Sequence, residues 1–413
     1  MPEIGISGDI IYTLLFISLY FEVFLLVSFL ERRAERFRPQ GGGNGAGALP
    51  RVAIVIPCFN EERTLASTIE SVLALRYPRE LLEAIVVDDG STDGTLKVAK
   101  QYEGREDVRI FHKENGGKHT ALNLALAETT ADLIGCLDAD STVGPDALMR
   151  IVPVFDNKDV SAVTPGIHVK NPKTMLQHVQ DAEYNLSVFN RFMLAALGSA
   201  FITPGPFSIF RTQTVRDLGG WRHGHSTEDM EMALRMQAGG HLIANAPSAT
   251  VHTSTPRTLP ELFRQRVRWT YGFLRNALDY RFMLGNRAYG NLGLMILPLA
   301  LVSVGAGIYF FIHVLWYWLE RLYDLILRIQ ITGAFPHPSL DLFYINTSAL
   351  WFLVYIAIAL ILVLICTGSW IGTGKRMPPV GTPLFILFYS FLTPLWLGTA
   401  VFRALFKTGV EWR

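Results

Sequence analysis

The sequence predicts an α/β domain with a mostly parallel sheet, joined to α-helical segments that cross a membrane. Between residues 51 and 137, short apolar runs of strand length alternate with amphipathic helical stretches. This alternation is typical of a parallel sheet with helices on both faces. Outside that region the chain contains several long apolar runs, and hydrophobic residues make up 50% of its 413 residues. That share indicates a membrane component.

Composition argues against two other classes. The chain has 37 Lys and Arg and 36 Asp and Glu, so its formal net charge is +1. Proteins that bind nucleic acid normally show a strong basic excess, and we expect no nucleic-acid partner. Cys58, Cys136 and Cys366 lie far apart, which argues against a disulfide framework or a zinc cluster.

The N-terminal residues 1–32 are interpreted as a membrane anchor. The apolar run at residues 10–30 contains one charge, Glu22, and an arginine-rich segment follows it directly. Because basic residues mark the cytoplasmic end of a span, we expect the following domain in the cytoplasm. A signal peptide would have the opposite charge order. Residues 33–50 include a Gly- and Ala-rich stretch and are interpreted as a flexible linker.

We assign residues 51–256 to the α/β domain. Its expected strands cover residues 52–56, 84–87, 108–111 and 133–137. Helices are expected after Asn60, which can serve as an N-cap, from about Asp93 and from Lys118. Apolar residues fall on one face of the first helix, namely Leu65, Ile69, Val72 and Leu73. From residue 138 to about residue 255 the pattern is mixed and polar.

Residues 257–288 form an expected membrane-interface segment, followed by a C-terminal membrane region at residues 289–413. Residues 259–282 are amphipathic and basic, and apolar runs follow at residues 292–316, 342–366 and 382–402. Lys375 and Arg376 mark the loop between the last two runs as cytoplasmic. Three spans would leave the C-terminus outside, although basic residues near the end of the chain argue weakly against this.

Acidic pairs follow two of the expected strands. Asp88 and Asp89 come directly after one strand, and Asp138 and Asp140 after another. Ligands of parallel sheets bind beyond the carboxyl ends of the strands. Because alternate residues on an extended segment point the same way, Asp138 and Asp140 can face one ligand. Their oxygens suit Mg²⁺ or Mn²⁺ held against phosphates. The alternative interpretation of both pairs is a polar turn.

Two later segments have a structural and a functional interpretation. Thr227 can cap a helix whose first turn contains Glu228 and Asp229, or these acids can supply a general base. Residues 265–269, with the sequence Gln-Arg-Val-Arg-Trp, can lie in a membrane-surface helix with snorkelling arginines. Arginine also binds pyrophosphate through paired hydrogen bonds, and tryptophan suits the apolar face of a sugar.

Together, these segments closely resemble the processive membrane glycosyltransferases of family 2, from residue 51 to about residue 273. That group includes cellulose, chitin, hyaluronan and poly-N-acetylglucosamine synthases and nodulation chitooligosaccharide synthases. The resemblance implies a Rossmann-like GT-A fold, a UDP-sugar donor, a divalent metal and inversion at the anomeric carbon. It rests on an ordered set of motifs, at residues 55–61, 88–91, 117–118, 138–140, 205–208, 227–229 and 265–269.

The resemblance also implies roles at the matching positions. The first loop packs at the nucleotide in this family, and here it contains Pro57, Asn60 and Glu61. Asp88 or Asp89 would contact the uridine, and the sequence does not distinguish between them.

The remaining roles concern the sugar and its diphosphate. Lys118 would bind the donor, Asp138 would hold the ribose or the metal, and Asp140 would bind the metal. Glu228 and Asp229 form the expected catalytic pair, with Asp229 as the base that deprotonates the acceptor. The pyrophosphate and the acceptor end would be held by Gln265, Arg268 and Trp269.

These roles predict an enzyme of the plasma membrane that extends a polysaccharide at the cytoplasmic face. The expected partners are a UDP-sugar, a glycan or glycolipid acceptor, the lipid bilayer and accessory export or assembly proteins. One alternative is a glycolipid synthase that adds a single sugar, because such enzymes share these motifs. Another is a transporter or membrane scaffold, but the C-terminal apolar runs contain few of the polar groups that transporters bury. Residues 370–375 resemble a substrate-gating loop only loosely, which puts a wide export channel in doubt.

Overall fold

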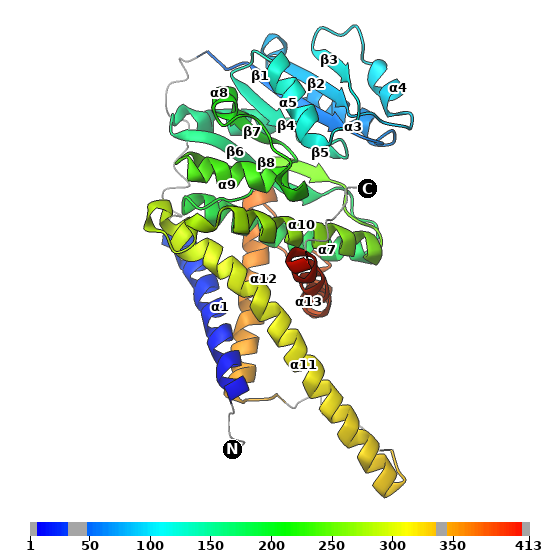
Figure 1. The fold of residues 1–413 in the computed structure, drawn as a ribbon, viewed down its shortest axis with the longest axis vertical. Coiled ribbons are helices and arrows are strands. Elements are labelled where there is room, and N and C mark those ends of the chain that lie inside the picture. The colour runs from blue at the N-terminus through cyan, green and yellow to red at the C-terminus, as the bar shows by residue number, and fades with distance from the viewer. Residues whose placement is uncertain (1–5, 32–47, 336–344, 407–413) are drawn as a thin grey trace.

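The computed structural model describes residues 6–31, 48–335 and 345–406. An α/β domain lies at one end of the molecule, and the long apolar helices extend from its base (Figure 1). Most of the expected linker at residues 33–50 lies outside the described residues. The three cysteines are free, and Cys58 and Cys136 are buried.

The domain is built on one eight-stranded sheet in the order β3-β2-β1-β4-β7-β6-β8-β5. Strands β1, β2, β3 and β4 pair in parallel, as do β6 and β8, whereas β7 and β5 pair with their neighbours in antiparallel fashion. The sheet is therefore mixed but mostly parallel, as predicted. Its strands are β1 (Val52–Cys58), β2 (Leu82–Asp88), β3 (Val108–His112), β4 (Leu133–Cys136), β5 (Ser141–Val143), β6 (Val160–Val169), β7 (Ser208–Arg211) and β8 (Leu242–Thr253).

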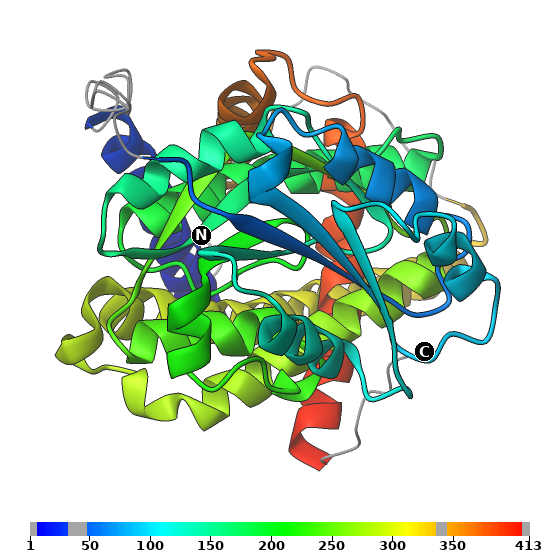
Figure 2. The ribbon, with the colours of Figure 1, turned by 90° about the horizontal axis from the view of Figure 1, so that it is seen from above.

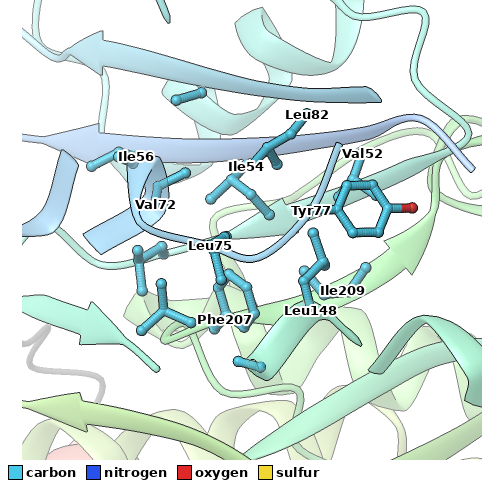
Figure 3. Close-up of a cluster of buried hydrophobic side chains, with 14 of the residues drawn as sticks. Val52, Ile54, Ile56, Val72, Leu75, Tyr77, Leu82, Leu148, Phe207 and Ile209 are labelled. Carbon is cyan, nitrogen blue, oxygen red and sulfur yellow. The ribbon is translucent and has the colours of Figure 1, made fainter. Parts of the chain in front are cut away.

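Both faces of the central strand β1 are buried. Val52, Ile54 and Ile56 pack in one hydrophobic cluster (Figure 3), whereas Ala53 and Val55 pack in a second cluster on the opposite face. A strand covered on both sides needs an apolar residue at every position. This explains why residues 52–56 form an uninterrupted apolar run and why the sequence predicted them well.

Helices cover both faces of the sheet. They are α3 (Leu65–Leu73), α4 (Thr95–Lys100), α5 (Lys118–Glu128), α6 (Ala147–Ile151), α7 (Met175–Ala196), α8 (Thr212–Asp217) and α9 (Glu228–Ala238). Helix α10 (Leu259–Asp279) packs against α9 and α13. The predicted apolar face of α3 is buried, but the predicted cap is wrong. Thr64 occupies the N-cap position of α3, whereas Asn60 accepts a hydrogen bond from the Thr92 backbone amide at 2.8 Å. Asn60 therefore ties two loops together.

The sequence did not indicate the second half of the sheet. Strands β5 to β8 and the 22-residue helix α7 fall in the region that reads as mixed and polar. Pro165 and Gly166 interrupt β6 at a register shift against β8, and proline within an apolar run normally argues against a strand. The sequence pattern typical of a strand is therefore weak in β6, where the strand has a register shift.

Among the described residues, four helices are long and apolar enough to cross a bilayer. They are α1 (Ile6–Glu31), α11 (Leu297–Thr332), α12 (Ala349–Thr373) and α13 (Thr382–Phe406). A short π-helical segment, Leu292–Ile296, leads into α11. Helix α11 continues well beyond the predicted residue 316, and α12 begins and ends later than the predicted residues 342–366. Helices α1 and α12 run away from the domain side by side, whereas α13 crosses beneath it (Figures 1 and 2).

Candidate active site

The two acidic motifs and the start of α9 lie beyond the carboxyl ends of the parallel strands. Cys58 of β1 is in register with Asp88 of β2 and Val55 with Cys136 of β4, so both acidic motifs leave the sheet at one edge. Helix α9 brings Glu228 to the same place, because Glu228 Oε1 lies 3.3 Å from Lys118 Nζ. Lys118 and Glu228, which are 110 positions apart in the sequence, are thus neighbours.

Lys118 is the centre of this cluster. Its Nζ donates a hydrogen bond to Asp138 Oδ1 at 2.6 Å and also faces Glu228. Burial disfavours the ammonium, but the Asp138 and Glu228 carboxylates outweigh it and hold the pKa of Lys118 well above its ordinary value. A Cβ on Gly205 would lie 2.5 Å from Lys118 Nζ. The loop at residue 205 therefore approaches the pair as closely as only glycine permits.

Asp140 lies in a more crowded environment. Burial and the neighbouring carboxylates of Asp138 and Glu61 raise its pKa to about 7. Its Oδ1 accepts a hydrogen bond from Ser141 Oγ at 3.0 Å, and the Thr253 hydroxyl lies 3.5 Å away. A buried carboxylate beside other carboxylates is stabilised by a cation.

The residues present fit a divalent metal. Asp138 and Asp140 offer hard oxygen donors, which Mg²⁺ and Mn²⁺ prefer, and Mg²⁺ commonly takes one or two carboxylates plus substrate phosphates. Within the described ranges, no group of three or more His, Cys, Asp or Glu side chains is placed to hold a metal ion. The pair would therefore need oxygens from a bound diphosphate to complete the coordination.

Asp229 stands at the start of α9. Burial and the adjacent Glu228 raise the pKa of its carboxyl group to about 6, although Lys118 opposes this increase. Its backbone carbonyl accepts a hydrogen bond from the Thr203 hydroxyl at 2.7 Å. A carboxyl group with a pKa near neutrality is suited to take up a proton.

The turn that precedes this helix has an unusual backbone. Gly224, His225 and Ser226 all have positive φ angles, between 53° and 65°. The Thr227 hydroxyl, which was expected to cap α9, instead donates to the Gly224 carbonyl at 2.8 Å. Two non-glycine residues in the left-handed region are a source of strain, and such strain concentrates at functional sites.

Asp88 and Asp89 are both held by protein groups. Asp88 is fully buried, and its Oδ2 lies 2.7 Å from His112 Nδ1. Asp89 Oδ2 accepts the Gly117 amide at 2.8 Å, and its Oδ1 accepts the Lys113 ammonium at 2.6 Å. Asp89 therefore shapes the loop before α5. A contact of either residue with a nucleotide stays a prediction.

The first loop has a similar structural role. Pro57 is buried within β1, and the Glu61 amide donates to Thr95 Oγ1 at 2.7 Å. The Glu61 carboxylate lies close enough to Asp140 to contribute to the raised pKa of Asp140. The loop is thus fixed against α4 and ends beside the expected metal site.

Helix α10 carries the Gln-x-x-Arg-Trp segment. Trp269 is 38% exposed, and Gln265 Oε1 is sealed from solvent without a hydrogen-bond partner among the described residues. The Arg266 guanidinium lies over the Trp269 ring at 4.2 Å and is held by Glu183 of α7 at 2.6 Å. The sequence did not single out Arg266 for a role of its own, although its place beside Trp269 was visible.

Helix α7 connects this segment to the acidic cluster. Burial raises the pKa of Tyr184 to about 12, against the lowering effect of Arg266, and the Glu183 and Asp140 carboxylates add to the increase. Tyr184 thus lies within electrostatic reach of Arg266 on α10 and Asp140 beyond β4. The structure brings Lys118, Asp138, Asp140, Glu228 and Asp229 into one cluster.

Residues 50–272 match the sequence profile of a family described as "Glycosyltransferase like family 2". Poly-beta-1,6-N-acetyl-D-glucosamine synthase of Staphylococcus aureus is 30% identical over 261 residues, which cover 62% of this chain and 63% of that protein. The synthase of the same name from Staphylococcus epidermidis is 30% identical over 224 residues, 54% of each chain. The chain therefore matches less than two thirds of the length of these relatives.

A solved structure shares the whole architecture. It is a mannosyltransferase from Pyrobaculum calidifontis in complex with GDP-Man and Mn²⁺, with a TM-score of 0.59 and 18% identity. The alignment covers 97% of this chain and 99% of that protein. At this identity the likeness concerns the fold, and it confirms the predicted GT-A-like domain joined to long apolar helices.

Proposed function

Because this chain belongs to the glycosyltransferase-like family 2, we propose that it transfers a sugar from a UDP-sugar to the end of a growing polysaccharide, with inversion, at the cytoplasmic face of a membrane. The relatives named as poly-N-acetylglucosamine synthases support N-acetylglucosamine as the first sugar to test. The observation that carries the proposal is the position of Asp229. Its buried carboxyl group, with a pKa near 6, adjoins the Lys118, Asp138 and Glu228 cluster.

Asp229 would act as the general base. An acceptor hydroxyl is a poor nucleophile, and Asp229 takes its proton as the oxygen attacks the anomeric carbon of the donor. The bond from that carbon to the diphosphate breaks in the same step, so the configuration inverts. General base catalysis typically contributes about 10²–10⁴-fold.

The other residues act on the leaving group and the acceptor. Lys118 holds Asp138 in place and adds positive charge beside the departing diphosphate. When bound at Asp138 and Asp140, Mg²⁺ or Mn²⁺ supplies further charge stabilisation of the diphosphate. The Arg268 guanidinium suits phosphate oxygens, and the half-exposed Trp269 ring offers a surface for the acceptor sugar. Preorganised charge of this kind is usually the larger catalytic contribution.

The test is a product assay with the full chain in lipid nanodiscs and a panel of UDP-sugars. We expect transfer from one UDP-sugar to give products of many sugars, to stop in EDTA and to resume with Mg²⁺ or Mn²⁺. An Asp229→Asn preparation serves as the inactive control.

Each part of the proposal can fail separately. Products that stop after one addition to a lipid would contradict polymer synthesis and favour a glycolipid synthase. Full activity in EDTA would contradict the proposed requirement for a divalent metal. Transfer from a GDP-sugar alone would overturn the donor class.

A further inference from the structure

Helix α13 has the length and composition of a membrane span but not the direction of one. Its 25 residues are apolar enough to cross a bilayer. In Figure 1 it is seen almost end-on, while α1 and α12 are seen along their length. In Figure 2 the relation is reversed, and α13 runs beneath the width of the domain. Helix α13 therefore lies crosswise to α1 and α12.

Contacts along the whole helix agree with this direction. Just before it, a Cβ on Gly381 would meet the His178 backbone of α7 at 2.1 Å. In its middle, Trp396 packs in the same cluster as Leu262 of α10, and near its end Ala404 packs against that cluster. A helix that left the domain to cross a bilayer would touch it at one end only.

A buried polar contact fixes the position of α13 relative to α7 and α10. The Tyr389 hydroxyl donates to Glu183 Oε2 at 2.8 Å, and Arg266 Nη2 donates to the same oxygen at 2.6 Å. Tyr389 is seven residues into α13, so a perpendicular helix would place it about 10 Å below the start of the helix. That depth would draw the charges of Glu183 and Arg266 into hydrocarbon, which is costly.

The opposite face of α13 is apolar and exposed. Because one face already packs on α7 and α10, this second apolar face requires an apolar partner. A partly open cavity of about 460 Å³ continues it between α13 and the start of α10, with Leu392 and Trp396 on one side and Leu259 and Phe263 on the other. The exposed apolar residues are Leu387, Phe388, Phe391, Leu395, Phe402, Leu405 and Phe406.

We propose that α13 lies in the plane of the membrane surface, on the same side as the catalytic domain, with its exposed face in the acyl chains. Gly307 of α11 lies against Leu397 of α13, and α1, α11 and α12, which also carry exposed apolar residues, extend from the same side of the domain. Three helices then span the bilayer, and both ends of α13 stay on the side of the domain. This differs from the topology predicted by composition, and it agrees with Arg403 in the last turn of α13.

The depth of α13 can be measured directly. Single nitroxide labels are placed on cysteines at 388, 391, 395, 402 and 405 of the otherwise cysteine-free full chain in nanodiscs. Their depth follows from the ratio of collisions with oxygen and with a polar nickel complex. An in-plane helix gives the same shallow depth at all five positions. Depth that rises to a maximum near 395 and falls again would overturn the proposal.

A matched scan on α12 supplies the control. Labels at 352, 356 and 363, which are exposed positions on that helix, should show the depth maximum of a span. Cysteine labelling in intact cells gives a second measurement. Cysteines at 377 and 405 should respond alike to an impermeant maleimide, and a cysteine at 335 should respond in the opposite way. Opposite responses at 377 and 405 would mean that α13 crosses the bilayer.

Discussion

At the scale of single residues, the site is defined by an imbalance of charge. Lys118 faces the carboxylates of Asp138 and Glu228 directly, and those of Asp140 and Asp229 lie within electrostatic reach of it. One ammonium cannot neutralise four carboxylates. Burial, together with the repulsion among these carboxylates, raises the pKa of Asp140 to about 7 and that of Asp229 to about 6. The same imbalance prepares the site for a cation and for a group that takes up a proton.

The raised pKa of Asp229 predicts the pH dependence of the reaction. A base acts only when deprotonated, so the rate should fall about tenfold per pH unit below pH 6 and level off above it. Asp229→Asn should lower kcat by about 10²–10⁴-fold, remove this acidic limb and leave UDP-sugar affinity nearly unchanged. Initial rates from pH 5 to pH 8 measure kcat and its pH dependence, and a binding titration measures the UDP-sugar affinity. If the rate of the Asn variant still falls below pH 6, the group that titrates is not Asp229.

At the scale of elements, α10 connects the proposed acceptor site to the proposed base. Trp269 lies at the middle of α10, and the second half of the helix contacts the strained turn before α9. Asn276 Nδ2 donates to the Gly224 carbonyl at 3.0 Å and lies 2.9 Å from the Thr227 hydroxyl. A Cβ on Gly272 would lie 2.3 Å from that hydroxyl. The helix that carries Trp269 therefore also holds the turn that leads to Asp229.

Gly272→Ala should consequently impair catalysis without touching the substrate. Alanine normally favours a helix over glycine by about 1 kcal/mol, so a loss has to come from the contact with Thr227. We expect kcat to fall about tenfold and the KM for the UDP-sugar to stay within about twofold. Adding Thr227→Ala removes the two closest atoms, Oγ1 and Cγ2, and should restore part of kcat, which a double-mutant cycle measures. Strictly additive losses would show that the two residues are not coupled.

The elements also show how far the sequence could predict this structure. Strands β1, β2 and β4 were predicted because their residues are buried in uninterrupted apolar runs. The Tyr389 to Glu183 contact joins positions 206 residues apart, and no local pattern encodes it. Apolar composition likewise predicted that α13 is long and lipid-facing but carries no information about its direction. The motif residues were identifiable because their order along the chain is distinctive, whereas Asn276 and Gly272 act only through tertiary contacts.

At the scale of the whole molecule, α12 joins the membrane region to the catalytic domain through two glycines. A Cβ on Gly368 would lie 1.9 Å from the Asn185 carbonyl of α7, and one on Gly372 would lie 2.8 Å from His168 of β6. Spacing of four residues places both glycines on one face of α12. Helix α12 thus approaches the domain at backbone distance, and this contact fixes the long apolar helix relative to the catalytic domain.

Gly368→Ala tests this junction. The added methyl group meets backbone, which cannot rotate away, so α12 must move off α7, and such overpacking typically costs about 1–3 kcal/mol. We expect a lower Tm of the full chain in nanodiscs and a reduced rate of sugar transfer. Gly398→Ala on α13 is the matched control, because a Cβ there meets nothing within 4 Å and the change should be neutral or slightly stabilising. Equal effects of the two substitutions would indicate a general response of apolar helices to alanine. A selective loss at 368 would show that the domain depends on its close contact with a membrane helix.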